Sequence, residues 1–373
     1  MSENSGLRVY VLGAGCSYDE QHGYPLAKGF LSELETYATM IQGRKDCQRI
    51  AKSVQQTVEL LKHYQSGQYQ VSTIDQLINL ILKHQCDKYL RAIHSRSPNG
   101  IAGIIFDTVR NAKVSTSACF LEKEGQVMER LLPKYKTFIH KIFNDGTVSV
   151  PCSNRLQNSN ARVFSFNYDR LFELAFFSAD IVDDDSRNPD PYELLNSGLN
   201  VNYTSDLEII KDRFCFIKLH GSIGIRCKEE LEYGPNVYRD GDIANWKQLK
   251  VTDEMFFASS MPGPFRDSPL IVFPYDKAFI RDGKPNKITS REYISKIWDH
   301  AEYVFKEATE MFVIGYSFSD GVDSKYLVDL MRRATNCRQI EIQNLPDECA
   351  RISNWLKDKH GFKVPIKMNH SKF

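Results

Sequence analysis

The chain of 373 residues exceeds the roughly 250–300 residues at which a single hydrophobic core stops growing, so we expect one large domain with an insertion or two domains. Its hydrophobic share of 42%, charged share of 25% and net charge of +1 are typical of a soluble globular protein and do not favour direct nucleic-acid binding. No stretch approaches the ~18 consecutive apolar residues of a membrane span, and the N-terminus lacks the pattern of a secretion signal.

The nine cysteines are irregularly spaced and include no CxxC pair. An odd number of thiols without a regular framework fits a reducing cytoplasm better than a disulfide-bonded protein. The missing CxxC pairs also argue against a structural zinc site, so we expect a cytoplasmic protein without zinc.

In chain order, a short β-rich segment comes first and a long helical region follows. Residues 7–12, LRVYVL, predict a strand that ends at a Gly-rich turn, and a helix is expected over 26–37. Apolar residues at helical spacing then continue to about residue 145 without a convincing strand. We therefore expect a first strand and turn within residues 1–34 and a large helical insertion over 35–150.

Strands return after the helical region. Runs of β-branched and aromatic residues predict strands at 161–166, 214–219, 269–273, 310–316 and 339–343. Apolar strands that alternate with helical patterns indicate an α/β fold whose parallel sheet is covered on both faces. We assign residues 151–345 to this core and 346–373 to a C-terminal extension, and we expect irregular structure at 180–193 and at 226–268.

The first motif, LGAGCS at residues 12–17, is a Gly-rich turn directly after a predicted strand. Glycines permit positive φ and let backbone N–H groups approach a ligand phosphate, and Ser17 could add a hydroxyl donor. The dinucleotide fingerprint GxGxxG fails at its last position, Tyr18, and the Lys-Ser/Thr pair of a P-loop is absent. A phosphate-binding loop and a tight turn without a ligand therefore both remain open.

Polar residues also end two later strands. VFSFNYDRLFELAF at 163–176 places Asn167 and Asp169 between a strand and a helix, where either could cap the helix or serve a site. FIKLHGSIG at 216–224 places His220 at the end of the next strand, although a lone histidine is more often structural. Because ligands of open α/β sheets bind outside the carboxyl ends of the strands, these residues are candidates for one site.

The last two motifs repeat this arrangement. VIGYSFSD at 313–320 follows an apolar strand with Gly315 and Ser317, and a helix cap is the alternative role of its final residues. EIQNLPDE at 341–348 follows a strand with Asn344, whose amide can bind hydroxyl groups. These strand ends could thus line one crevice large enough for a nucleotide.

The order of these motifs resembles that of the sirtuin-like NAD-binding family. GAGCS, NYD, KLHG and GYSFSD follow one another as in that family, and GYPLA at 23–27 and FPYDK at 273–277 are similar to its bacterial branch in antiphage defence. The resemblance covers residues 7–34 and 161–345 and implies a Rossmann-like parallel sheet that binds NAD. The helical insertion resembles no family that we can name.

The resemblance implies roles for the residues that match the motifs. The positions that contact the NAD phosphates or the adenosine ribose are Gly13, Ala14, Gly15, Ser17, Gly315, Ser317 and Asn344. The positions of the catalytic group are Asn167, Asp169 and His220. An asparagine amide can hold a water and a ribose hydroxyl, and a histidine can act as a base near neutral pH.

Two departures from the family argue against protein-lysine deacetylation. The four zinc-binding cysteines of deacetylases are absent, and Phe166 replaces the glutamine of their Gln-Asn dipeptide. Hydrolysis of NAD+ needs only water as the acceptor and is compatible with both departures. We therefore expect an NAD+ hydrolase that needs no cofactor beyond its substrate.

The resemblance also implies an effector of antiphage defence that depletes NAD+. We expect a homo-oligomer, or a co-encoded partner such as an ATPase or nuclease, to hold the activity back until infection. One alternative is a catalytically silent module that binds NAD or ADP-ribose. Others are a transferase that acts on protein and a dehydrogenase, which the failed fingerprint disfavours.

Overall fold

The computed structural model divides into two compact units, each assembled from segments that are distant in sequence. Unit 1 comprises Met1–Gly23, Val127–His220 and Glu292–Phe373, and unit 2 comprises Tyr24–Gln126 and Gly221–Arg291. The structure describes residues 6–19, 23–66, 69–84, 100–143, 159–177, 214–230, 234–239, 250–257, 267–271, 273, 290–318 and 322–371.

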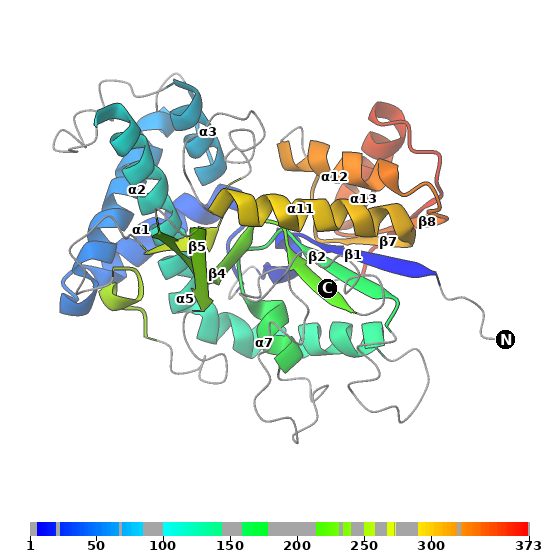
Figure 1. The fold of residues 1–373 in the computed structure, drawn as a ribbon, viewed down its shortest axis with the longest axis horizontal. Helices are drawn as coiled ribbons and strands as arrows, with labels where there is room; N and C mark the ends of the chain where they lie inside the picture. The colour runs from blue at the N-terminus through cyan, green and yellow to red at the C-terminus, as the bar shows by residue number, and fades with distance from the viewer. Residues whose placement is uncertain are drawn as a thin grey trace. The chain divides into compact units, whose positions relative to one another are not determined.

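A six-stranded parallel sheet forms the centre of unit 1 (Figure 1). Its strands are β1 (Leu7–Leu12), β2 (Ala161–Ser165), β3 (Cys215–Lys218), β7 (Ala308–Ile314), β8 (Gln339–Gln343) and β9 (Ile366–Asn369). Their spatial order is β3-β2-β1-β7-β8-β9, so the chain builds outward from β1 on one side and returns with β7 on its other side. This is the strand order of Rossmann folds, and the predicted α/β Rossmann-like sheet is confirmed.

The strand residues alternate between two covered faces of this sheet. On one face, Tyr10 of β1 stacks on Phe312 of β7 at 4.7 Å between ring centroids and meets Phe138 edge-on at 5.7 Å. On the other face, Phe164 of β2 lies 5.0 Å from Phe305. Burial on both faces explains why the strands read as continuous apolar runs.

The helices of unit 1 supply these covering residues. They are α7 (Leu171–Phe177), α11 (Ser290–Glu307), α12 (Val322–Arg333), α13 (Pro346–Asn354) and, from Val127 onward, the long helix α5 (Gly100–Phe143). In Figure 1, α11, α12 and α13 are drawn above the sheet and α7 below it. Short helical turns at Ala14–Ser17 (η1) and Trp355–Lys359 (η6) complete the unit.

One strand predicted for the parallel sheet lies elsewhere. The run expected at 269–273 forms β6 (Asp267–Ile271), which pairs antiparallel with β4 (Gly221–Glu230) in unit 2. β5 (Gly234–Arg239) pairs with the other edge of β4 and completes a three-stranded sheet. The prediction was wrong because an apolar run does not reveal which strand it will join or in which direction.

Other boundaries also differ from the expectations. β4 and β5 lie within or next to the region 226–268 that was expected to be irregular, and β9 was not predicted at all. β4 and β5 contain glycine, proline or several charged residues, and β9 is only four residues long. Local indicators of β-structure are therefore weak, and pairing with neighbouring strands decides the conformation. The acidic run at 180–193 and all of FPYDK beyond Phe273 lie outside the described residues.

The helical region predicted after the first strand is confirmed for the described residues of unit 2. It contains α1 (Phe30–Ile41), α2 (Gln48–Ser66), α3 (Ile74–His84) and the first part of α5, with helical turns at Ala27–Gly29 (η2) and Lys45–Cys47 (η3). A further helical turn of unit 2, η5 (Asp253–Met255), lies outside this region. Thr73 caps α3 by accepting the backbone N–H of Gln76 at 3.2 Å, and the Gln76 side chain accepts the N–H of Ser72 at 2.7 Å. The arrangement resembles a capping box, except that Gln76 accepts the N–H of the residue before the N-cap, and it marks the helix start locally.

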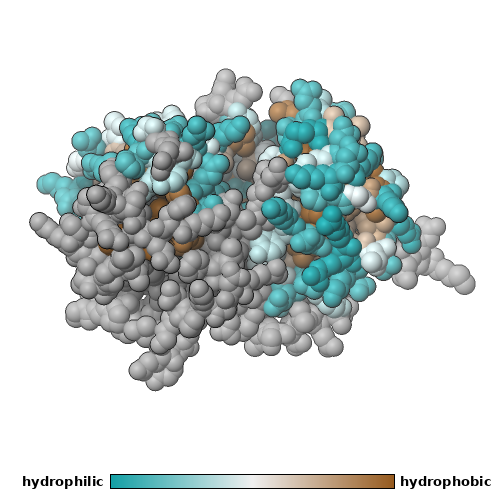
Figure 2. Space-filling view, turned by 90° about the horizontal axis from the view of Figure 1, so that it is seen from above, coloured by the Kyte–Doolittle hydropathy of each residue, from teal (hydrophilic) through white to brown (hydrophobic). Residues whose placement is uncertain are grey.

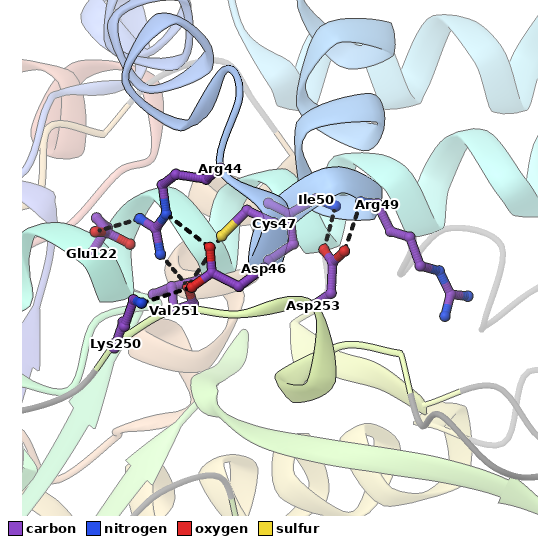
Figure 3. Close-up of polar contacts among 9 residues, drawn as sticks. All are labelled: Arg44, Asp46, Cys47, Arg49, Ile50, Glu122, Lys250, Val251 and Asp253. Atoms are coloured by element: carbon purple, nitrogen blue, oxygen red, sulfur yellow. Dashed lines mark hydrogen bonds and ion pairs between the residues drawn. The ribbon is translucent and has the colours of Figure 1, made fainter.

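A charged cluster joins residues 250–257 to the helices of unit 2 (Figure 3). The Arg44 guanidinium donates to Glu122 of α5 at 3.0 Å and to the carbonyl oxygen of Val251 at 2.7 Å. The Asp253 carboxylate accepts two backbone N–H bonds of 2.8 Å in the first turn of α2, from residues about 200 positions earlier. A remote side chain therefore serves as the cap of α2.

The described surface seen in Figure 2 is mainly hydrophilic, and its hydrophobic residues lie in small separate areas. Among the described residues, the exposed large hydrophobic side chains are Tyr18, Leu26, Met40, Tyr69, Leu345 and Met368. Scattered exposure of this kind is ordinary for protein surfaces. None of the described helices has the length and apolar composition required to cross a membrane.

Candidate functional site

All ten residues predicted for the site lie in unit 1, after the carboxyl ends of five neighbouring strands. Gly13, Ala14, Gly15 and Ser17 follow β1, Asn167 and Asp169 follow β2, His220 follows β3, Gly315 and Ser317 follow β7, and Asn344 follows β8. The strand order reverses at β1, so β1 and β7 flank the switch point at which sheets of this order bind ligands. The sheet thus brings residues from widely separated segments to one edge.

The loops after β1 and β7 meet directly at this switch point. Gly13 donates its N–H to the carbonyl oxygen of Ile314 at 2.9 Å, and Gly15 donates to Gly315 at 2.8 Å. A Cβ on Gly315, whose φ is +62°, would lie only 2.5 Å from the nitrogen of Cys16. The glycines are therefore required for the close approach of the two loops, and the exposed Ala14 is the part of the first loop that a ligand could reach.

Asn167 ties the end of β2 to the loop after β1. Its Nδ2 donates to the carbonyl oxygen of Gly13 at 3.0 Å and to the hydroxyl of Ser17 at 3.1 Å. A carbonyl oxygen can only accept, so this contact fixes which way the amide is turned. Both amide hydrogens are engaged, and the side-chain oxygen Oδ1 is the group with which Asn167 could bind a water or a hydroxyl.

Tyr135 of α5 extends this network and was not found from the sequence. Its hydroxyl lies 2.9 Å from the hydroxyl of Ser17, and burial raises its pKa well above the ordinary value. It therefore stays protonated and can hold Ser17 in place. In the sequence Tyr135 is one more apolar position of a helical pattern, so no local signal points to it.

Asp169 has a positioning role in the observed contacts. Its carboxylate accepts the N–H of Leu171 at 3.0 Å at the start of α7, and its backbone carbonyl accepts a bond from the ammonium of Lys218. Lys218 also pairs with Glu173 at 3.1 Å, and both side chains are almost fully buried. Burial raises the pKa of Glu173, and Lys218 opposes that rise. The end of β3 and the helix that follows β2 are thus joined by a buried ion pair that sequence reasoning missed.

His220 lies between aromatic rings at the end of β3. The ring of Phe166 meets it edge-on at 5.1 Å between centroids, and the ring of Tyr168 lies 5.6 Å away. The indole N–H of Trp298 donates to the carbonyl oxygen of Leu219 at 3.1 Å and fixes the backbone next to the histidine. Nε2 of His220 lies 3.2 Å from a carboxylate oxygen of Asp323 on α12. The imidazole is therefore held from several sides.

The remaining predicted residues belong to the loop after β7 and its support. The amide of Asn344 donates to the carbonyl oxygen of Tyr316 at 3.2 Å, and its oxygen accepts the N–H of Leu345 at 2.9 Å. Arg351 donates to the carbonyl oxygens of Ser317 and Phe318. Asn344 thus supports the loop, while Ser317 is exposed where a ligand could contact it. The last two residues of the motif, at 319 and 320, lie outside the described residues.

Within the described ranges, no group of three or more His, Cys, Asp or Glu side chains is placed to hold a metal ion. The cysteines among these residues are free thiols: Cys16, Cys47, Cys119, Cys215, Cys337 and Cys349. Burial raises the pKa of Cys47 to about 11 and that of Cys215 to about 12, so neither is a thiolate at neutral pH.

Comparison of the chain with models of known protein families and with curated protein sequences finds no match to either. The motifs and the geometry at the sheet edge therefore carry the functional information.

Proposed function

We propose that the chain is an NAD+ hydrolase, which converts NAD+ and water to nicotinamide, ADP-ribose and a proton. The observation that carries the proposal is the Asn167 amide, which joins the loop after β1 to the end of β2 beside the switch point of a Rossmann-like sheet. Sheets of this order bind nucleotides at that point. The ordered motifs that resemble sirtuin-like proteins lie at the same edge.

Departure of nicotinamide needs little assistance from the protein. When the bond between nicotinamide and ribose breaks, its electron pair goes to the ring nitrogen, nicotinamide departs neutral, and positive charge builds on the sugar as an oxocarbenium-like state. No general acid is required. A water must form the new bond to the anomeric carbon, and its proton must pass to a base.

Asn167 and His220 have the groups for these tasks. Since both amide hydrogens of Asn167 are engaged, its Oδ1 would accept a hydrogen bond from the water or from a ribose hydroxyl and orient it. His220 would act as the base, and Asp169 would position the start of α7 without touching substrate.

The biological setting follows from the resemblance alone. We propose that the enzyme depletes NAD+ as an antiphage effector, and that a homo-oligomer or a co-encoded ATPase or nuclease restrains it before infection. An unrestrained NAD+ hydrolase would kill its own cell. Expression of the wild type without the neighbouring genes is therefore expected to slow growth, whereas expression of the Asn167→Ala variant is not.

The test is nicotinamide release from NAD+ by the purified protein, measured together with nucleotide binding. Asn167→Ala and His220→Ala are each expected to lower turnover by about 100-fold or more, which corresponds to a loss of ~2.7 kcal/mol of transition-state stabilisation. Asn354→Ala and His370→Ala are matched controls, because both residues are exposed and neither belongs to the predicted site. These controls should retain wild-type turnover.

Each outcome discriminates between the candidate functions. Release by the wild type and the controls, but not by the two site variants, supports the hydrolase. Binding of NAD+ or ADP-ribose without release, both alone and with the neighbouring gene products, supports the silent binding module. The absence of both binding and release under those conditions would contradict both functions.

A further inference from the structure

The carboxylate of Asp323 faces the imidazole of His220. Oδ2 of Asp323 lies 3.2 Å from Nε2 of His220, and the two side chains are only 13% and 6% exposed. The contact has ion-pair distance, but it does not meet the geometry of a hydrogen bond at Nε2. Catalytic hydrogen bonds in ligand-free structures are often misaligned in this way and tighten when substrate binds.

The fold keeps Asp323 in this place. Asp323 is the second residue of α12, and a carboxylate in the first turn of a helix is stabilised by the N-terminal end of the helix dipole. Its neighbour Ser324 lies 3.4 Å from the hydroxyl of Tyr316 in the loop after β7. The start of α12 is therefore attached to the same strand end that carries Gly315 and Ser317.

The other neighbours of His220 limit how its ring can turn. Phe166 meets the imidazole at an interplanar angle of 89° and also packs against Tyr316 at 4.7 Å. Tyr168 lies on another side of the imidazole at an angle of 34°. With aromatic rings on these sides, the carboxylate of Asp323 is a charged group close enough to Nε2 to favour a proton on that nitrogen.

We propose that Asp323 is a positioning residue for His220. It holds the Nε2–H tautomer, so that Nδ1 keeps its lone pair and can accept the proton of the attacking water or of a ribose hydroxyl. The imidazolium formed in that step then carries a positive charge that the Asp323 carboxylate balances. The catalytic part of this inference rests on the proposed NAD+ hydrolysis, whereas the pairing itself does not.

The kinetic test is a double-mutant cycle. Asp323→Asn keeps the shape of the side chain but removes its charge, and it is expected to lower kcat about 10-fold or more with little change in KM. In the His220→Ala background the same substitution should have no further effect, because a positioning residue acts only through its partner. Asp329→Asn on the same helix is the matched control, since Asp329 is 61% exposed and pairs only loosely with Arg332 at 3.7 Å.

A second measurement keeps the pairing testable when no hydrolysis is observed. The ¹⁵N chemical shifts of the His220 ring are expected to show the Nε2–H tautomer in the wild type and in Asp329→Asn, and a different tautomer mixture in Asp323→Asn. Unchanged shifts in Asp323→Asn would overturn the pairing. An equal loss of kcat in both backgrounds would overturn the positioning role, while an inactive wild type with the expected shifts would count against the hydrolase alone.

Discussion

The sheet edge of unit 1 and the segment 250–257 of unit 2 both depend on polar side chains, but they hold them in different surroundings. At the sheet edge, Asn167, Ser17 and Lys218 are buried, and their partners are backbone carbonyls or other buried groups. In unit 2, the ion pairs of Arg44 and Lys250 lie between partly exposed side chains (Figure 3).

The difference determines what a lost contact costs. A buried donor or acceptor that loses its partner cannot turn to water, so the full desolvation penalty is felt. An exposed charge that loses its partner is solvated instead, and exposed ion pairs contribute little. We therefore expect substitutions at the sheet edge to be far more damaging than comparable ones in the charged cluster.

The largest effect is expected from Lys218→Met. The substitution leaves the buried carboxylate of Glu173 without its cation, and removal of one partner from a buried ion pair costs ~3–5 kcal/mol of unfolding free energy. The pKa of Glu173, already raised by burial, should rise further. Its proton is then bound more tightly in the folded state, so the variant should lose stability as pH rises above the ordinary value of 4.5.

Urea unfolding at two pH values measures this loss. The control is the double variant Lys218→Met with Glu173→Leu, which replaces the pair by apolar groups and should recover much of the lost stability. Equal stability of the single variant and the wild type would show that the pair is not buried in solution.

The next largest effect is expected from Gly315→Ala, which is compared with Gly43→Ala because both glycines have a positive φ. Gly315 at the sheet edge and Gly43 in unit 2 have φ values of +62° and +86°, but a Cβ would clash only at Gly315. Gly43→Ala should therefore cost ~1–2 kcal/mol for the left-handed conformation alone, and Gly315→Ala should cost ~1–3 kcal/mol more for overpacking. Unfolding measurements on both variants give the difference, and Gly361→Ala, also without a clash, serves as a control within unit 1. Equal costs would contradict the close contact of the two loops.

A smaller effect is expected from Asp253→Ala in unit 2. The carboxylate caps the first turn of α2 through two 2.8 Å bonds, and loss of such a cap typically costs ~1 kcal/mol. Hydrogen exchange of the backbone amides of Arg49 and Ile50 should accelerate in this variant. Asp253→Asn keeps one acceptor oxygen and should accelerate exchange less, and unchanged exchange in both would mean that the cap is not formed.

The smallest effect is expected from Lys250→Ala. Its ammonium is well exposed and pairs with Asp46 at 2.8 Å, so the unfolding midpoint at neutral pH should be nearly unchanged. Hydrogen bonds from Lys250 and then Arg44 lower the pKa of the Asp46 carboxyl. The lowered pKa of Asp46 stabilises the folded protein at pH values above the ordinary pKa of 3.8, and this stabilisation is lost as the pH falls. Any difference in stability between the variant and the wild type should therefore disappear in acid. A large loss at neutral pH would contradict the exposed setting of the cluster.

Most of the sheet could be predicted because strand signals are local. Residues 7–12 and 339–343 were predicted to the residue, since β-branched and apolar runs there end at glycine or polar residues. The run at 269–273 was assigned to the wrong sheet, because its composition suits either a parallel or an antiparallel neighbour. The polar residues at the strand ends could also be predicted, although not what each side chain contacts.

The sequence by itself determined which residues end the parallel strands and that Gly-rich, Asn, His and Ser positions recur there. Only the tertiary structure decided their partners: Tyr135 with Ser17, Lys218 with Glu173, and Asp323 with His220. The physical reason is distance along the chain, since Ser17 and Tyr135 are 118 residues apart. Local propensity acts over a few neighbours, whereas a hydrogen bond between remote residues forms only when the packed sheet and helices bring them together.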